Sequence, residues 1–512
     1  EILPLLIKAF NEMEKLADNY WINVKKKELL DVIRSVAGLW IEATADNYSY
    51  SPGNEIKINA GIVNRSDYPL KLERINIHYL KNDSLINQNL SEGNFISRDY
   101  SFNLPNDISI TQPYWLVNKR EKFRYTIDDQ VLIGKAESDP ALIAEFILSS
   151  GDGDITLSTP VLYRWNDPVE GEKYRPIEII PQVTISLQDK IYLFPTNDGR
   201  EISFTIRNNT DSFNGNVKLK LPESWNVTPA EIPISFDEKA REKQVSFMIT
   251  PPKQTEEAEF TVEVISENEI YNKEMVTISY PHIVTQTLFP EASGKLVRLN
   301  TEKIISSIGY VEGSGDDTPK YLEQLGYKVE KLSDNQLENG ILKYDAIVTG
   351  IRAFNTRKRL SALNKKLLDY VYNGGTLVVQ YNTNGNLVTD EIGPYPFKIS
   401  RDRVTDEESF IVFLRSDHRL LNYPNRITQK DFDGWIQERG LYFTNNVDLR
   451  YETIIGMNDK GESPLLSGII YAKYGKGVFI YTSLSFFREL PAGIPGAYRL
   501  FINLISAGRQ SG

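Results

Sequence analysis

The sequence predicts a multidomain protein of mixed class: a helix pair, two β-sandwich domains and a carboxyl-terminal α/β domain. Three observations lead to this prediction. The chain has 512 residues, enough for roughly three or four domains of ordinary size. Its composition, 41% hydrophobic and 25% charged, is that of a globular protein. Its apolar residues recur at helical spacing first, then with a period of two, and finally in alternating strand and helix runs.

Residues 1–38 are predicted to form two helices. Leu6, Phe10 and Met13 lie at helical spacing, and so do Leu29 and Ile33. A helix pair of this size is marginal alone, so we expect it to pack on a larger domain. The pattern starts inside a helix and without methionine, so we expect the sequence to be a fragment or a processed product of a longer chain.

Residues 39–175 are predicted to form a β-sandwich domain. The segment "EIKINAGIVNRS" alternates apolar and polar residues at Ile56, Ile58 and Ala60. Turn signals such as "SPGN" and "GDGD" separate this strand from others like it.

Residues 182–281 are predicted to form a second sandwich. Alternating runs include Phe204 with Ile206 and Val217 with Leu219. About seven strands in about 100 residues are typical of an immunoglobulin-like domain, here without its cysteine pair. We expect this domain to be a spacer or an interaction module.

Residues 283–512 are predicted to form an α/β domain. The order is strand, helix, strand, strand, helix, strand, from "KIISSIGYV" through "YDAIVTG" to "TLVVQY". Such an alternation predicts a parallel sheet with crossover helices. In such sheets the ligand-binding groups lie beyond the carboxyl ends of the strands.

The composition excludes several kinds of chemistry. The chain contains no cysteine, so it has no disulfide, no thiolate nucleophile and no cysteine-based zinc site. Its three histidines are far apart in the sequence, which argues against a histidine-built metal site. The net charge of -11 argues against nucleic acid as a partner. No apolar stretch reaches the ~20 residues that span a bilayer.

Polar clusters in the last domain provide the candidate ligand-binding residues. They come from "GIRAFNTR", "QYNTN", "RDRVTDEES", "DFDGWIQERGLYF" and "FFRELPAGIPGAYR". An arginine beside a glutamate either binds a carboxylate or phosphate, or neutralises its neighbour and holds a loop. The second interpretation is favoured, because the chain offers no nucleophile beside these groups. The candidates are Arg352, Asn355, Gln380, Asn382, Arg403, Glu407, Asp431, Trp435, Glu438, Arg439, Arg488 and Glu489.

Several of these strings resemble a known family. "GIRAFNTRKRL", "YVYNGGTLVVQYNTN" and "FFRELPAGIPGAYRLFINLIS" look like the carboxyl-terminal region of large Bacteroidetes-type PIG-L (LmbE-like) deacetylases, and "QPYWL" and "VLYRWNDPVEGEKYRP" look like the β domains before it. In that family a zinc-dependent N-acetylglucosaminyl de-N-acetylase domain lies nearer the amino terminus. Its His-Pro-Asp-Asp motif does not occur here. The resemblance thus implies that a deacetylase partner domain, and the zinc that it binds, lie outside this sequence.

The last two domains have resemblances of their own. Residues 182–281 are similar to the immunoglobulin-like domain associated with α-galactosidases. Residues 283–512 resemble class I glutamine amidotransferase-like and ThuA-like domains, which have a flavodoxin-type fold. In the amidotransferases a cysteine sits on a sharp turn after a strand. The turn after Val379 is the favoured equivalent, with a neighbouring strand as the alternative, and neither offers a cysteine.

Three hypotheses for function remain open. The chain is a non-catalytic accessory region of a sugar deacetylase, or a carbohydrate-binding module with its site on the last domain, or a hydrolase that uses carboxylates such as Glu407 and Glu438. The first two imply a glycan or sugar ligand. By resemblance we expect a periplasmic, cell-surface or secreted protein.

Overall fold

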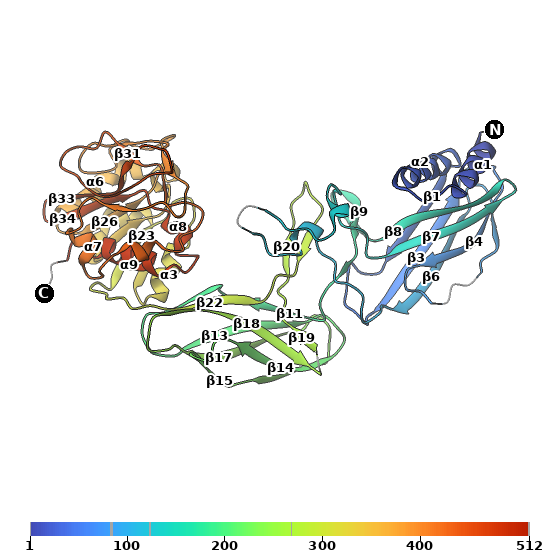
Figure 1. The fold of residues 1–512 in the computed structure, drawn as a ribbon, viewed down its shortest axis with the longest axis horizontal. Coiled ribbons are helices and arrows are strands. Elements are labelled where there is room, and N and C mark those ends of the chain that lie inside the picture. Colours follow the sequence, from blue (N-terminus) through green and yellow to red (C-terminus); the bar gives the residue numbers. More distant parts are fainter. Residues whose placement is uncertain (1, 82–84, 122–123, 268, 510–512) are drawn as a thin grey trace.

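The computed structural model describes residues 2–81, 85–121, 124–267 and 269–509. Figure 1 shows three bodies of secondary structure, which follow one another from the amino terminus in blue to the carboxyl terminus in red. The protein is β-rich and built from several sheets, as the sequence predicted. Within these ranges no helix combines the length and apolar character needed to cross a bilayer.

The first unit places two helices on a sandwich-like sheet. Helix α1 (Leu3–Glu14) buries Ile7 and Phe10, and helix α2 (Tyr20–Val36) is capped by Asn19, whose side chain accepts the N–H of Ile22. The long strand β8 pairs with β7 along its first half and with β1 and β9 along its second. The strands are β1 (Leu39–Ala45), β2 (Ser49–Tyr50), β3 (Glu55–Asn64), β4 (Leu70–Ile77), β5 (Gln88–Leu90), β6 (Phe95–Asn103), β7 (Ile143–Ser150), β8 (Gly153–Asp167), β9 (Gly171–Pro176) and β10 (Glu178–Ile179).

The second unit consists of two sheets that share one core. One sheet has the order β11-β13-β17-β15, and the other contains β12-β22-β18-β14-β16. The rings of Phe204 on β13 and Phe260 on β18 join them, with centroids 5.9 Å apart. The strands are β11 (Val183–Leu187), β12 (Ile191–Phe194), β13 (Arg200–Asn208), β14 (Phe213–Lys220), β15 (Asn226–Thr228), β16 (Ile232–Phe236), β17 (Glu242–Thr250), β18 (Glu256–Ser266), β19 (Glu269–Tyr271), β20 (Val276–Ile278), β21 (Gln286–Leu288) and β22 (Ser293–Arg298).

The strand pairing moves one expected domain boundary. Residues 182–281 were predicted to form the second sandwich and 283–512 the last domain. Strand β22 nevertheless lies between β12 and β18, so the second unit continues to Arg298. The hairpin β20–β21 interrupts the sandwich and reaches the first unit, where Gln286 donates to Glu137 and Thr287 to Glu178. This excursion breaks the alternating pattern and hides the last strand from sequence inspection.

The last unit is built on one mixed sheet. Its order is β24-β23-β25-β26-β34-β33-β32-β29, in which the strands from β24 to β34 are parallel and the rest antiparallel. The strands are β23 (Ser307–Val311), β24 (Lys328–Lys331), β25 (Ala346–Thr349), β26 (Thr376–Gln380), β27 (Lys398–Ile399), β28 (Arg403–Val404), β29 (Val412–Phe413), β30 (Gly440–Leu441), β31 (Thr444–Asn445), β32 (Glu452–Met457), β33 (Leu465–Tyr474) and β34 (Gly477–Thr482).

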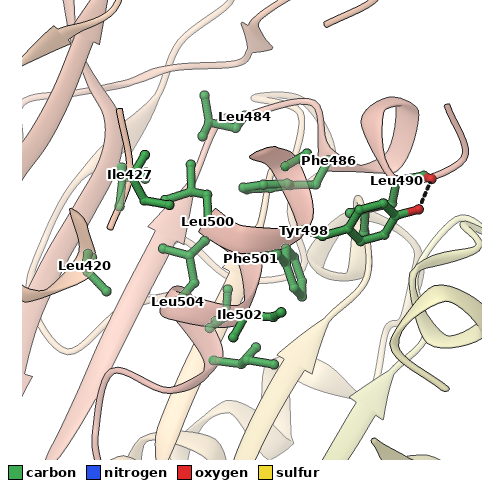
Figure 2. Packing of buried hydrophobic residues seen from close by; sticks show 14 of the residues in the cluster. Leu420, Ile427, Leu484, Phe486, Leu490, Tyr498, Leu500, Phe501, Ile502 and Leu504 are labelled. Carbon is green, nitrogen blue, oxygen red and sulfur yellow. Dashed lines mark hydrogen bonds between the residues drawn. The ribbon is translucent and has the colours of Figure 1, made fainter. Parts of the chain in front are cut away.

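Helices cover both faces of this sheet. Alternate residues of β25 point to opposite faces, since Val348 packs with α9 and Ile347 with α6. Figure 2 shows how Leu500, Phe501 and Leu504 of α9 fill one of these cores. The helices are α3 (Thr318–Gln324), α4 (Asp334–Asn339), α5 (Ala353–Thr356), α6 (Leu360–Tyr372), α7 (Arg419–Asn422), α8 (Phe486–Glu489) and α9 (Pro495–Ile505).

The second and last units make direct contact. Gln324 of α3 accepts the N–H of Leu193 at 3.0 Å and a guanidinium N–H of Arg200 at 2.8 Å. Ile191 and Val297 belong to the same buried cluster as α3 and α9. The last unit is therefore fixed to its neighbour by apolar contact as well as by hydrogen bonds.

Candidate functional site

The carboxyl ends of three adjacent parallel strands form one edge of the last unit. Strands β25, β26 and β34 are neighbours, so the residues that follow them lie together. The backbone N–H of Arg352, after β25, donates to the carbonyl of Tyr381, after β26, at 2.8 Å. An isolated bridge between Gly440 and Leu484 brings a distant loop to the same place. We call this region the carboxyl edge.

A strained turn opens the carboxyl edge. Arg352 has φ 56° and ψ 24°, the left-handed conformation that a non-glycine residue rarely adopts. Helix α5 begins at the next residue, so the chain makes a sharp strand-to-helix turn, and the Arg352 side chain is exposed. The sequence favoured the turn after Val379 as the equivalent of the amidotransferase cysteine turn, with a neighbouring strand as the alternative. The left-handed residue follows β25, which is one of the two strands beside β26.

The predicted amides are engaged with the backbone. Asn382 is fully buried; its carbonyl accepts the N–H of Phe354 at 2.9 Å and its amide donates to the carbonyl of Gln380 at 3.0 Å. Gln380 is 1% exposed and donates to the hydroxyl of Tyr310 at 3.3 Å. Asn355 donates to the carbonyl of Thr383 at 3.1 Å. These amides fix the turns of the edge and are not presented to a ligand, which corrects their prediction as ligand-binding residues.

Trp435 and Asp431 also lie in the interior. Trp435 is 2% exposed, and its indole N–H donates to the carbonyl of Asp431 at 3.0 Å. Asp431 accepts from Arg499 at 2.9 Å and from the backbone of Thr428 at 2.7 Å. With both faces of the indole covered, Trp435 cannot stack on a sugar, and its assignment as a ligand-binding residue is corrected to a core residue.

Arg439 and Glu489 are the two most buried ionisable residues of the carboxyl edge. Arg439 is 5% exposed and donates to the backbone carbonyls of Ser409, at 3.1 Å, and Phe432. Burial lowers its pKa. Glu489 is fully buried, and burial raises its pKa to about 8, although hydrogen bonds from Ile436 N–H and Ser485 and the charge of Arg439 act in the opposite direction.

Arg488, Glu407 and Arg403 are closer to solvent, whereas Glu438 is buried. The Arg488 Nε donates to Glu438 at 2.8 Å, and its guanidinium lies 4.7 Å from the ring centroid of Phe487. Glu407 is half-buried, and its charge acts on both Arg439 and Glu489. Arg403 is exposed on β28, which pairs with β30. The structure thus brings most charged candidates together and leaves Arg403 at the margin.

The sequence did not reveal an aromatic cluster at the same edge. The rings of Tyr381 and Tyr442 are stacked with centroids 5.9 Å apart, and Phe487 lies 5.3 Å from Tyr381. Burial raises the pKa of Tyr381 to about 12, against the opposing charges of Arg352 and Arg488. These rings come from three separate loops, so no local spacing in the sequence could group them.

The carboxyl edge is better suited to binding a ligand than to catalysing a reaction. Its carboxylates are committed, since Asp431 pairs with Arg499, Glu438 pairs with Arg488, and Glu489 is enclosed. In the described part of the chain, no three histidine, aspartate or glutamate side chains gather as a metal-binding group. What faces outward is the guanidinium of Arg352 beside partly exposed aromatic rings.

Comparisons with known proteins give little. No family model matches the sequence, and no curated protein matches it. Among solved structures, a Thermoplasma acidophilum protein assigned to GMP synthase covers 40% of this chain and 96% of its own, at 10% identity and a TM-score of 0.27. WR4, a C. elegans MSP family member, covers 22% of this chain and 97% of its own, at 15% identity and a TM-score of 0.15. The match to Salmonella alpha-2-macroglobulin covers 52% of this chain and 17% of that protein, at 7% identity and a TM-score of 0.17. These scores are too low to assign a function.

Proposed function

We propose that this chain is a non-catalytic, carbohydrate-associated region of a PIG-L-type sugar deacetylase, in which the last unit is a degenerate amidotransferase-like domain. The observation that carries the proposal is Arg352 on the strained turn after β25. A residue on such a turn is presented to a ligand, and an amidotransferase would need a thiol there. A guanidinium stays protonated in proteins and cannot attack a carbonyl, but it can bind an anion or a hydroxyl.

The sheet order supports the flavodoxin-type assignment of this unit. Taken in chain order, the five parallel strands have the spatial order 2-1-3-4-5, which is typical of that fold. Ligands of such folds bind beyond the carboxyl ends of the strands, where Arg352 and Tyr381 lie. The carboxyl ends of the strands are therefore the place where this unit would bind a ligand or organise its neighbouring domains, without catalysis.

The purified chain should show neither of the two activities that its resemblances imply. We expect no acetate release from N-acetylglucosamine oligomers with added zinc, and no ammonia release from glutamine. Both products are measured by coupled assays, with an intact PIG-L-type deacetylase and an intact amidotransferase as positive controls. Acetate release that a chelator abolishes would refute the proposal, and so would glutamine hydrolysis that Arg352→Ala abolishes.

A second candidate is a carbohydrate-binding module with its site on the carboxyl edge. It is favoured by the partly exposed rings of Tyr442 and Phe487 beside Arg352 and Arg488. Aromatic faces and hydrogen-bond donors are suited to a sugar ring. Calorimetric titration with a set of glycans should show binding that Tyr442→Ala weakens and Arg403→Ala leaves unchanged. Equal affinities of the two variants would reject this site.

The carboxylate-hydrolase hypothesis lacks a supporting observation. A glycosidase requires two carboxyl groups facing a cleft, one of them free to move a proton. Glu438 and Asp431 are each held by an arginine, and Glu489 has no exposed surface. Glu407 is the one carboxylate of the four that is not buried, so no two of them face a cleft. Periplasmic, cell-surface or secreted localisation stays a prediction from the resemblance.

A further inference from the structure

A cavity of about 760 Å³ lies beside α6, lined mainly by the segment 384–399. It adjoins the carboxyl edge through the loop after β26, where Asn355 donates to the carbonyl of Gly385 at 2.8 Å, but none of the candidate residues above lines it. Leu368, Leu387 and Tyr395 give it an apolar side. Its volume falls within the range of small-molecule sites, roughly 300–1,000 Å³, and exceeds that of a single sugar ring.

The wall of this cavity is rigidly held. Tyr395 lies between two prolines, and the hydroxyl of Tyr451 donates to its carbonyl at 2.9 Å. The guanidinium of Arg450 lies 3.9 Å from the Tyr395 ring centroid. Asn364 of α6 donates to the carbonyl of Glu391. A wall fixed in this way loses little conformational entropy when a ligand binds.

The polar side of the cavity carries carboxylates without a cationic partner. Asp390 and Glu391 are exposed, and neither forms an ion pair within the described ranges. The amides of Asn384 and Asn446 lie on the same lining, with Lys398 as its basic residue. This contrasts with the carboxyl edge, where the carboxylates are neutralised from within the protein.

We propose that this cavity binds an amino sugar, a pyranose or short oligosaccharide with a free ammonium group. The ammonium group would donate to Asp390 and Glu391, which form charge-assisted hydrogen bonds with cations. The hydroxyls are recognised by Asn384 and Asn446, and the apolar face of the sugar ring lies on the wall with Leu368 and Leu387. The inference rests on the proposed function and deepens it, because the ligand is the de-N-acetylated form of the glycan.

This site distinguishes sugars with a free amino group from sugars whose amino group is acetylated. An N-acetyl group removes the positive charge and leaves the two carboxylates without a cationic partner. Neutral oligosaccharides keep the contacts of their hydroxyls and of their apolar face, and they lose only the charged contacts. The expected preference is therefore for glucosamine oligomers over N-acetylglucosamine oligomers of equal length.

Calorimetric titration of the whole chain tests this preference with matched tetramers of glucosamine and N-acetylglucosamine. We expect the glucosamine tetramer to bind at least about tenfold more tightly. Replacing Asp390→Asn together with Glu391→Gln should abolish that preference. The control is Asp402→Asn with Glu462→Gln, which removes the same charge from exposed positions outside the cavity lining. Its affinity should stay within about twofold of the unmodified chain.

Each contrary result has a distinct meaning. Equal weakening by the two double variants would overturn the inference, because it indicates attraction to the acidic protein as a whole. Loss of binding in Arg352→Ala but not in the cavity variant moves the ligand to the carboxyl edge; this overturns the inference and leaves the proposed function intact. Absence of glucosamine binding also overturns it. Acetate release by the chain would instead remove the proposed function.

Discussion

Arg439 and Glu489 at the carboxyl edge are shielded from water and surrounded by protein partners, whereas Asp390 and Glu391 beside α6 are exposed and unpaired. Both pairs belong to the same α/β unit. A buried ionisable group must be paired from within the protein or stay neutral, so the first pair is tied to stability. An exposed carboxylate costs little and keeps its capacity to bind, so the second pair is available for a ligand.

Replacing Arg439→Met should have the largest effect. The change keeps the apolar stem but removes the donors to the carbonyls of Ser409 and Phe432 and the charge beside Glu489. Leaving buried partners without compensation costs roughly 3–5 kcal/mol. The free energy of unfolding of the last unit is measured by urea denaturation, with pulse hydrogen exchange on the peptides of α9.

Arg488→Met is the matched control for this prediction. Arg488 belongs to the same edge and pairs with Glu438, but a third of its side chain is exposed. Its loss leaves the buried Glu438 without its partner but removes a half-hydrated arginine, so the free energy of unfolding should fall by about 1–3 kcal/mol, less than for Arg439. Equal losses in the two variants would show that burial does not determine how much each arginine contributes to the free energy of unfolding.

The stability of the last unit should fall as the pH rises, because of Glu489. Burial raises the pKa of this carboxyl to about 8 in the folded protein, from an ordinary value of 4.5. Between these values the folded state keeps the proton and the unfolded state releases it, so a rising pH favours unfolding. The free energy of unfolding should fall by about 3 kcal/mol between about pH 5 and pH 8.

Glu489→Gln should remove most of this slope. The amide keeps the size of the side chain and cannot ionise, so the variant should be more stable than the unmodified protein at about pH 8 and similar to it at about pH 5. Urea denaturation at several pH values, with the exchange pulse at one fixed pH, measures both proteins. An unchanged slope in the variant would assign the pH dependence to another group.

The sequence was a good guide to the strands and a poor one to burial. Period and turn signals place β25, α6 and β26 because these depend on neighbours in the chain. The same signals cannot tell that Trp435 and Gln380 are covered, since the segments that cover them come from distant loops. The boundary near β22 was missed for a related reason, as its partners β12 and β18 lie before the β20–β21 hairpin.

The candidate site was predicted in composition but not in geometry. Arginines and glutamates after the strands do meet at one edge, as the rule for parallel sheets requires. Packing between distant segments decides whether Arg439 faces water or the carbonyl of Phe432, and the local spacing of residues in the sequence does not predict it. The cavity beside α6 was not foreseen, because Leu368 and Asn446 meet only in the folded chain.

Arg352→Gly should have the smallest effect and the opposite sign. The left-handed conformation at φ 56° costs a non-glycine residue roughly 1–2 kcal/mol, and glycine adopts it freely. Glycine also gains entropy in the unfolded chain, so the net stabilisation should be about 0.5–1 kcal/mol. Arg352→Ala is the control, because it removes the side chain and keeps the strain, and it should match the unmodified protein. If Arg352→Ala stabilises the unit as much as Arg352→Gly does, the destabilisation comes from the guanidinium and not from the left-handed backbone. The turn would then not be a strained element that is retained to present a side chain.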